Sequence, residues 1–139
     1  MNYVDHILLS RFYQIAKIST ITLDTFLTKT SNTELQTIIS KQLANYDVLV
    51  TECCTLAKAH KVALADHIFF KRCRQIIDEN FENISITPAI VIACTCISSL
   101  NTLIEIYNVE SADSETINIG KHLQIMQENN LQILSQLKL

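Results

Sequence analysis

The stretch SITPAIVIACTCISSLNTLIEIYNV, residues 85–109, decides the fold class of this chain. Thr87 can cap a helix, and Pro88 suits the first helical position, where its missing N–H has no intrahelical partner to lose. In the ten residues that begin at Pro88, the only polar side chain is that of Thr95. Apolar residues on every side predict a helix over 85–108 that other helices bury on nearly all sides.

The composition points to a single helical domain over residues 1–139. A chain of 139 residues can bury a sizeable core without disulfides or metals. It contains a single glycine, Gly120. Because dinucleotide-binding and phosphate-binding loops need several glycines, and hairpin turns favour them, the sequence argues against those sites and favours helices joined by short polar loops.

Charge and apolar length exclude two classes of partner. The net charge is −3 and no basic block occurs, so we expect no nucleic-acid binding. The strictly apolar run is about ten residues, whereas a membrane-spanning helix needs about 20, so we expect no membrane insertion. No signal peptide is recognised, and an odd number of cysteines indicates reduced, mostly buried thiols in a cytoplasmic protein: Cys53, Cys54, Cys73, Cys94 and Cys96.

Four further segments show helical periodicity, and together they predict an all-α, antiparallel, ferritin-like four-helix bundle. A short extra helix within 61–83 would place Ile68, Phe69, Cys73, Ile76 and Ile77 on one side, unless this segment belongs to one long helix that bends near Pro88. The three remaining long helices are predicted over 3–29, 33–60 and 114–138.

The apolar stripes of the long helices contain polar members. In 33–60 the stripe alternates steps of four and three, as in a bundle seam. Gln42 and Tyr46 of this stripe, and Asn130 of the last helix, must find hydrogen-bond partners if they are buried. Gly120 would be costly unless a neighbouring helix packs closely over it. The stripe of 33–60 comprises Leu35, Ile39, Gln42, Tyr46, Leu49, Cys53, Leu56 and His60; that of the last helix comprises Ile119, Leu123, Met126, Asn130, Ile133 and Leu137.

The order of these pieces resembles a group of small, uncharacterised ferritin-like bundle proteins of Firmicutes. The resemblance covers nearly the whole chain, and it implies a fold more than an activity. It lies in a glutamine and tyrosine ahead of a leucine–alanine pair, an alanine that opens a small-residue segment, and a final stretch QENNLQILSQLKL: Gln42, Tyr46, Leu56, Ala57, Ala89, Glu128, Asn129, Asn130, Leu131, Leu134 and Leu137.

A ferritin-like bundle raises the question of a carboxylate metal site. Such a site takes a Glu from each of two helices and a Glu-x-x-His pair from each of the others, and here no Glu precedes a His by three residues. We therefore predict no metal or other cofactor. The alternative is a degenerate site for iron, manganese or a small ligand, with Gln42 and Tyr46 behind the ligands Glu52, Glu105, Glu128 and His122.

The favoured hypothesis is a non-enzymatic scaffold or protein-interaction module that binds a protein partner or a second copy of itself as a homodimer. No catalytic spacing occurs, and the chain has more apolar residues than one bundle needs. Apolar positions outside the main stripes are typical of a partner surface. They are Val48, Val50, Leu103, Ile104, Ile106, Leu131 and Leu134.

Overall fold

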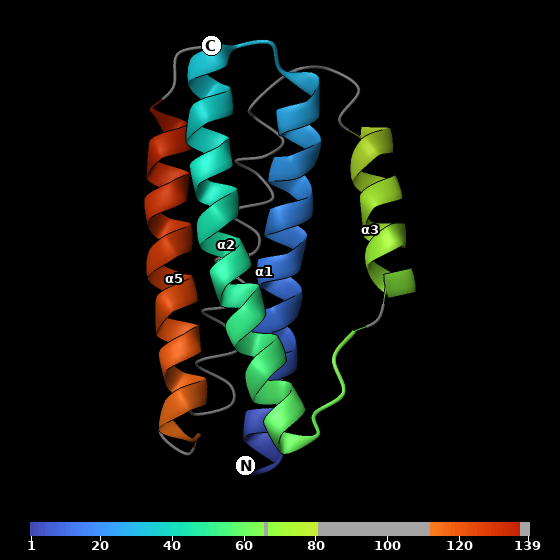
Figure 1. Ribbon diagram of the computed structural model, residues 1–139, viewed down its shortest axis with the longest axis vertical. Coiled ribbons are helices and arrows are strands. Elements are labelled where there is room, and N and C mark those ends of the chain that lie inside the picture. Colours follow the sequence, from blue (N-terminus) through green and yellow to red (C-terminus); the bar gives the residue numbers. More distant parts are fainter. Residues whose placement is uncertain (66, 81–111, 137–139) are drawn as a thin grey trace.

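The computed structural model describes residues 1–65, 67–80 and 112–136, and within these ranges the chain forms helices and no strand (Figure 1). The all-α prediction is confirmed for this part of the chain. The predicted helix over 85–108 lies outside the described residues. The helices are α1 (Tyr3–Lys29), α2 (Thr33–His60), α3 (His67–Asn80) and α5 (Ser114–Ser135).

The ends of α1 and α2 follow from local capping. Asn2 caps α1 by accepting a hydrogen bond from the Asp5 N–H at 2.9 Å, and Asp5 accepts one from the Asn2 N–H in return. Asn32 caps α2 by accepting from the Leu35 N–H at 3.0 Å. The predicted helix ranges 3–29 and 33–60, and the short loop between them, are therefore confirmed.

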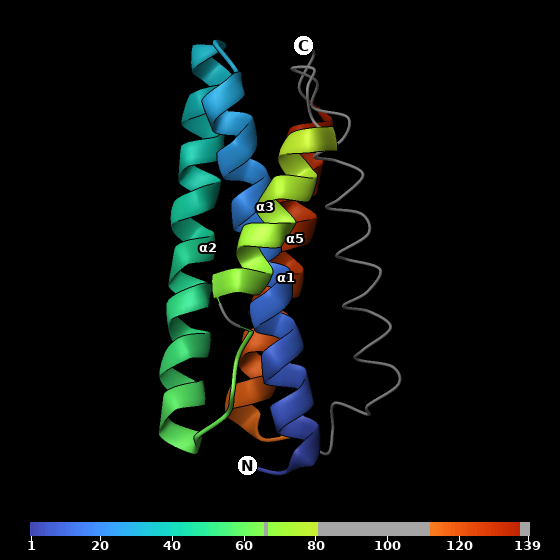
Figure 2. The same cartoon turned by 90° about the vertical axis from the view of Figure 1, so that its right-hand side faces the viewer.

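The described helices lie along a common axis, with α1 at their centre. Figures 1 and 2 show α1 and α5 running in the same direction and α2 running opposite to both. The helix α1 contacts α2, α3 and α5, whereas α3 makes its main contacts within this set with α1. Figure 2 shows α3 lying against the flank of α1.

The core forms where α1, α2 and α5 meet. The first six members of the predicted α2 stripe, Leu35 to Cys53, are buried, but the stripe then continues through Ala57 while Leu56 is half-buried and His60 is exposed. A straight α-helix drifts by about 20° per heptad, which moves the buried line off the heptad positions. On α1, Tyr3 lies at the start of the helix and its side chain is 78% exposed.

A close approach between α1 and α5 explains Gly120. A Cβ at this position would lie 2.7 Å from Cζ of Phe12, whose ring is almost completely buried. The expectation that a neighbouring helix packs over this glycine is confirmed, and the contact offsets the low helix propensity of glycine. Further along α5, Leu123 and Asn130 are buried as expected, but Ile133 is exposed, contrary to the predicted stripe.

A helix within the predicted segment 61–83 is confirmed by α3, but its buried face differs from the prediction. The residues that would join it to the predicted helix over 85–108 lie outside the described ranges. Phe70 and Ile77 are the buried residues, and they pack on Ile21 of α1. The ring of Phe70 also meets that of Tyr13 edge-on at 5.5 Å. The prediction was wrong for Ile68, Phe69 and Ile76, which are exposed. Apolar residues lie on two faces of α3, and their spacing alone does not show which face packs on α1.

Polar side chains from α1, α2 and α5 are buried in the core, and we call them the polar layer. Gln127 of α5 donates to the Ser19 hydroxyl at 3.1 Å, and Ser19 donates to the Ile15 carbonyl at 2.8 Å. Gln42 on α2 is 3% exposed, and neither polar atom of its amide has a hydrogen-bond partner among the described residues. Asn130 is also buried. The predicted burial of Gln42 and Asn130 in the seam is confirmed, whereas the expected partner for Gln42 is not found there.

Candidate functional site

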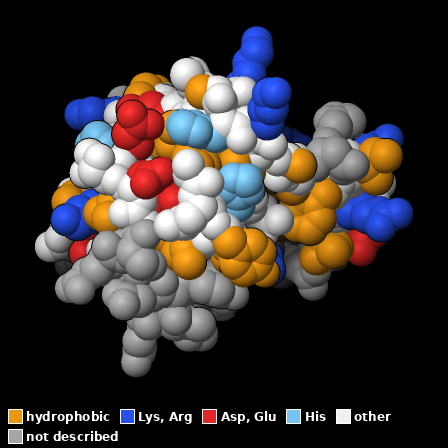
Figure 3. All heavy atoms as spheres, turned by 90° about the horizontal axis from the view of Figure 1, so that it is seen from below, with side chains coloured by type: hydrophobic (Ala, Val, Ile, Leu, Met, Phe, Trp, Pro, Cys, Tyr) orange, Lys and Arg blue, Asp and Glu red, His pale blue; other side chains and the backbone are white. Residues whose placement is uncertain are grey.

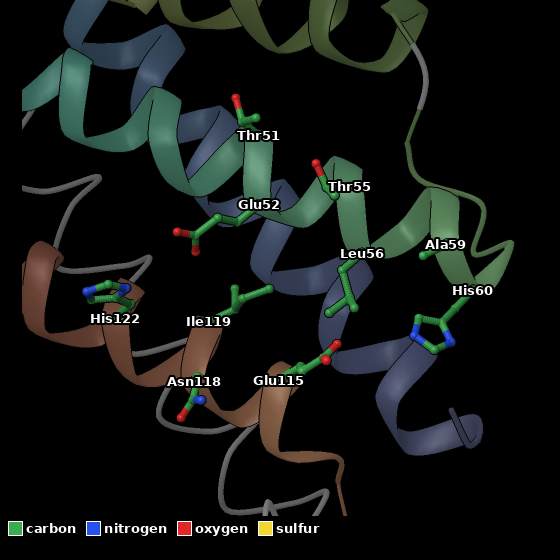
Figure 4. A pocket seen from close by; sticks show the side chains of 10 residues that line it. All are labelled: Thr51, Glu52, Thr55, Leu56, Ala59, His60, Glu115, Asn118, Ile119 and His122. Carbon is green, nitrogen blue, oxygen red and sulfur yellow. The ribbon is translucent and has the colours of Figure 1, made fainter.

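A groove lies between the second half of α2 and the first half of α5 (Figure 4). We call it the α2–α5 groove. Its volume is about 620 Å³, within the range of about 300–1,000 Å³ that is typical of small-molecule sites. The lining residues are Thr51, Glu52, Thr55, Leu56, Ala59 and His60 from α2, and Glu115, Asn118, Ile119 and His122 from α5.

Two acid–imidazole pairs lie along this groove. In Figure 4 the carboxylate of Glu52 points toward the side on which His122 lies, and the carboxylate of Glu115 points toward His60. Leu56 and Ile119 lie between the two pairs. The antiparallel course of α2 and α5 explains this arrangement, because side chains on a helix lean toward its N-terminus and therefore lean in opposite directions on the two helices.

Figure 3 shows the lower end of the molecule, where histidine and acidic side chains lie beside hydrophobic ones. None of the ten lining residues of the groove is Lys or Arg, and two of them are Glu. All four acid and imidazole side chains belong to exposed residues, so a ligand can reach them from solvent. The local charge therefore favours cationic groups.

The register of α5 against α1, and hence the geometry of the groove, depends on Asp5. This residue is fully buried, and one of its carboxylate oxygens accepts a hydrogen bond from the Asp113 N–H at 2.7 Å, just before α5 begins. Burial by itself raises the pKa of Asp5. The hydrogen bonds from the backbone N–H groups of Asn2 and Asp113, with smaller contributions from Thr116 and the amino terminus, together lower the pKa by more than burial raises it. The resulting pKa lies below the ordinary value, so the carboxylate form is stabilised.

The predicted alternative metal ligands are only partly brought together. Glu52 and His122 line the same groove, Glu128 is exposed and is not among the lining residues, and Glu105 lies outside the described residues. Within residues 1–65, 67–80 and 112–136, no three His, Cys, Asp or Glu side chains are placed to hold a metal ion. The described donor set therefore does not fit a carboxylate di-iron or di-manganese site.

Sequence reasoning missed the roles of His60 and Glu115. In the sequence, His60 was placed in the stripe of 33–60, and Glu115 was given no role in a site. A usable signal was present: Glu52 and His60 lie eight residues apart, and Glu115 and His122 lie seven apart. Spacings of two helical turns place each pair on one face of its helix.

Burial favours the protonated thiol at two of the described cysteines, Cys53 and Cys73. Cys53 is fully buried, and burial, with smaller contributions from Cys54 and Glu52, raises the pKa of its thiol to about 12. Burial also raises the pKa of Cys73. Of the three described cysteines, Cys53 is buried as expected, Cys73 is half-buried and Cys54 is exposed, while Cys94 and Cys96 lie outside the described residues. A protonated thiol is a poor nucleophile and a poor metal ligand.

Comparisons with known proteins add no relative. The chain matches no protein-family model, and it matches neither a curated protein nor a solved structure. The resemblance to ferritin-like proteins of Firmicutes therefore stays a prediction. Among the helices of the described ranges, none combines the length and the apolar character needed to cross a membrane.

Proposed function

We propose that this chain is a non-enzymatic helical module that binds another protein. The observation that carries the proposal is the surface that α3 turns away from α1. We call it the α3 outer face, and it consists of Ile68, Phe69, Arg72 and Ile76. Ile68 and Ile76 are each 60% exposed and Phe69 is 40% exposed, although this helix has only 14 residues. Large apolar side chains gathered on one exposed face are typical of a docking surface.

The charges on this face select the kind of partner. Arg72 is exposed and lies four residues from both Ile68 and Ile76, and Lys71 is its neighbour in sequence. Figure 3 shows hydrophobic and basic side chains together on the side where α3 lies. A partner helix with apolar residues around a central carboxylate would complement this pattern. Symmetric pairing of two α3 helices about Arg72 would instead oppose like charges, which disfavours a homodimer through this face.

The arrangement of helices supports a ferritin-like bundle as the scaffold. Ferritin-like folds have one long crossover connection, unlike simple up-and-down bundles. Here α1 and α5 run in the same direction, and the chain returns from the lower end of α2 along α3 toward the upper end (Figure 1). With one further helix over 85–108, this course would match a single long crossover.

Site-specific photocrosslinking in cells that express the chain naturally tests the proposed interaction. A photoreactive residue at position 76 should capture a protein whose crosslinked peptide is rich in Asp and Glu, and Arg72→Glu should reduce the yield at least several-fold. The control position is Thr37, which is exposed on α2. Equal capture from position 37, insensitivity to Arg72→Glu, or crosslinking mainly to a second copy would contradict the proposal.

A second candidate function is a small-ligand- or metal-binding bundle. It is favoured by one observation, which is that Glu52 and His122 both line the α2–α5 groove. Elemental analysis of untagged protein purified without chelator tests the metal version. Stoichiometric iron or manganese that Glu52→Gln removes would support it, whereas metal retained by Glu52→Gln would remove that residue from the site.

A further inference from the structure

We propose that the α2–α5 groove binds a linear aliphatic polyamine, with one terminal ammonium at each of its two acid–imidazole pairs. The inference deepens the small-ligand candidate and does not depend on the α3 outer face, which belongs to another helix. It combines the size of the groove, its apolar middle and the placement of its two carboxylates.

The spacing of the charged groups sets the length of the ligand. On α2, Glu52 and His60 are separated by about 12 Å, and on α5, Glu115 and His122 are separated by about 10 Å, at 1.5 Å per residue. Because the helices are antiparallel, the two pairs, Glu52 with His122 and Glu115 with His60, face opposite ends of the groove (Figure 4). A ligand that reaches both carboxylates therefore needs two cationic groups about 10 Å apart.

The apolar middle of the groove suits the methylene segment that joins the two ammonium groups of the ligand. Leu56 and Ile119 are apolar, and both lie between the two pairs in Figure 4. Methylene groups laid over them would leave water, which favours binding. Asn118, which also lines the groove, offers an amide oxygen as an acceptor for an internal N–H.

A compact dication fits this arrangement less well. A divalent metal ion needs several donors converging within about 2–2.6 Å, whereas the two carboxylates here point to different ends of the groove. A single organic cation would reach one pair and leave the other unoccupied. The site therefore favours an extended dication over a metal ion or a monoamine.

Calorimetric titration of the full chain with linear α,ω-diamines of increasing length tests the proposal, with a monoamine of matched carbon number as reference. Affinity should peak where the nitrogens are about 10 Å apart, as the helix spacing requires. Glu52→Gln and Glu115→Gln should each weaken binding about twofold to fivefold, in keeping with exposed ion pairs, and the double variant should weaken it further. Glu128→Gln is the matched control, since this Glu lies on α5 outside the groove.

Backbone amide chemical shifts locate the bound probe independently of affinity. The shifts that respond to the diamine should belong to α2 from residue 51 to 60 and to α5 from residue 115 to 122. Binding without length dependence, equal weakening by Glu128→Gln, or a manganese or zinc titration that moves the same amides while diamines do not would overturn the proposal. Failure here would leave the α3 outer face untouched, because its test uses a different helix.

Discussion

The helix α1 is held very differently on its two sides. Toward α2 and α5 it contributes Leu8, Leu9 and Phe12, each at most 1% exposed, to a continuous core. Toward α3 it contributes Ile21, with Tyr13 and Ile18 partly buried around it. Two polar contacts between α1 and α3 are exposed: the ion pair between Arg74 and Asp24 at 2.9 Å and the hydrogen bond from Lys29 to the Asp78 carbonyl at 3.5 Å. The helix α3 is therefore an accessory of the bundle, and it keeps part of its apolar surface outward.

The largest effect is expected from removing an aromatic ring on either side of α1. Phe12→Ala should lower the free energy of unfolding by about 3–5 kcal/mol, because it leaves a cavity in the shared core. Phe70→Ala should mainly release α3, so hydrogen exchange should accelerate in α3 amides while α1 and α2 stay protected. Equal loss of protection in all helices of the Phe70→Ala variant would show that α3 belongs to the cooperative core.

The next effect concerns the two aspartates of α1. Asp5→Asn should destabilise the chain by about 1–3 kcal/mol, because Asn cannot accept both backbone hydrogen bonds without presenting an amide donor to one of them. Asp24→Asn, at the exposed ion pair with Arg74, should cost about 0–1 kcal/mol. Urea unfolding at pH 7 measures both changes, and similar values for the two variants would contradict the structural role of Asp5.

The pH dependence of Asp5 has a definite sign. Because its pKa in the folded chain lies below that in the unfolded chain, its stabilisation is present above the unfolded value of about 3.9 and is lost as the pH falls through the lower folded value. The difference in unfolding free energy between the wild-type chain and Asp5→Asn should therefore shrink in acid. A difference that grows as the pH falls would show that the pKa is raised.

A smaller effect is expected at the contact between α1 and α5. Gly120→Ala places a Cβ against the ring of Phe12. Overpacking costs about 1–3 kcal/mol, and the gain in helix propensity returns about 1 kcal/mol, so a net loss of about 1 kcal/mol is expected. In a Phe12→Leu background the same substitution should be neutral or stabilising. Thermal unfolding of the four chains gives the coupling, and an additive result would rule out the direct contact.

The smallest effect is expected in the polar layer. Gln42→Met should leave the free energy of unfolding unchanged or raise it by about 1 kcal/mol, because it removes a buried amide that lacks partners among the described residues. Gln75→Met on the exposed surface of α3 is the control and should change little. A clear destabilisation by Gln42→Met alone would mean that this amide makes a hydrogen bond that the described residues do not supply.

Helix limits were predictable because caps act over a few residues. Asn2 and Asn32 each bond an N–H three residues ahead, and such a signal is visible in the sequence around them. The burial of Gln42 and Tyr46 was also predictable, since both follow a seam spacing. The face of α3 was not: several spacings fit its closely placed apolar residues, and the choice depends on where Tyr13 and Ile21 of α1 stand.

The candidate site was half predictable. Glu52 and His122 were identified as ligands of one site, but their relation to Glu115 and His60 depends on the register between α2 and α5. That register is not written in either helix alone. It follows from the turn at Thr30–Asn32, which aligns α1 with α2, and from Asp5 and Ser19 of α1, which bond Asp113 and Gln127, in each case 108 residues away.

The sequence by itself therefore determined helical character, the limits of α1 and α2 and the buried line of α2, because these depend on contacts within one or two turns. The tertiary structure decided that α1 and α5 run in the same direction, that α3 keeps Ile68 and Ile76 outward, and that two acid–imidazole pairs line one groove. Such features depend on how separate helices align, and that alignment arises from packing and from hydrogen bonds between distant residues such as Asp5 and Asp113.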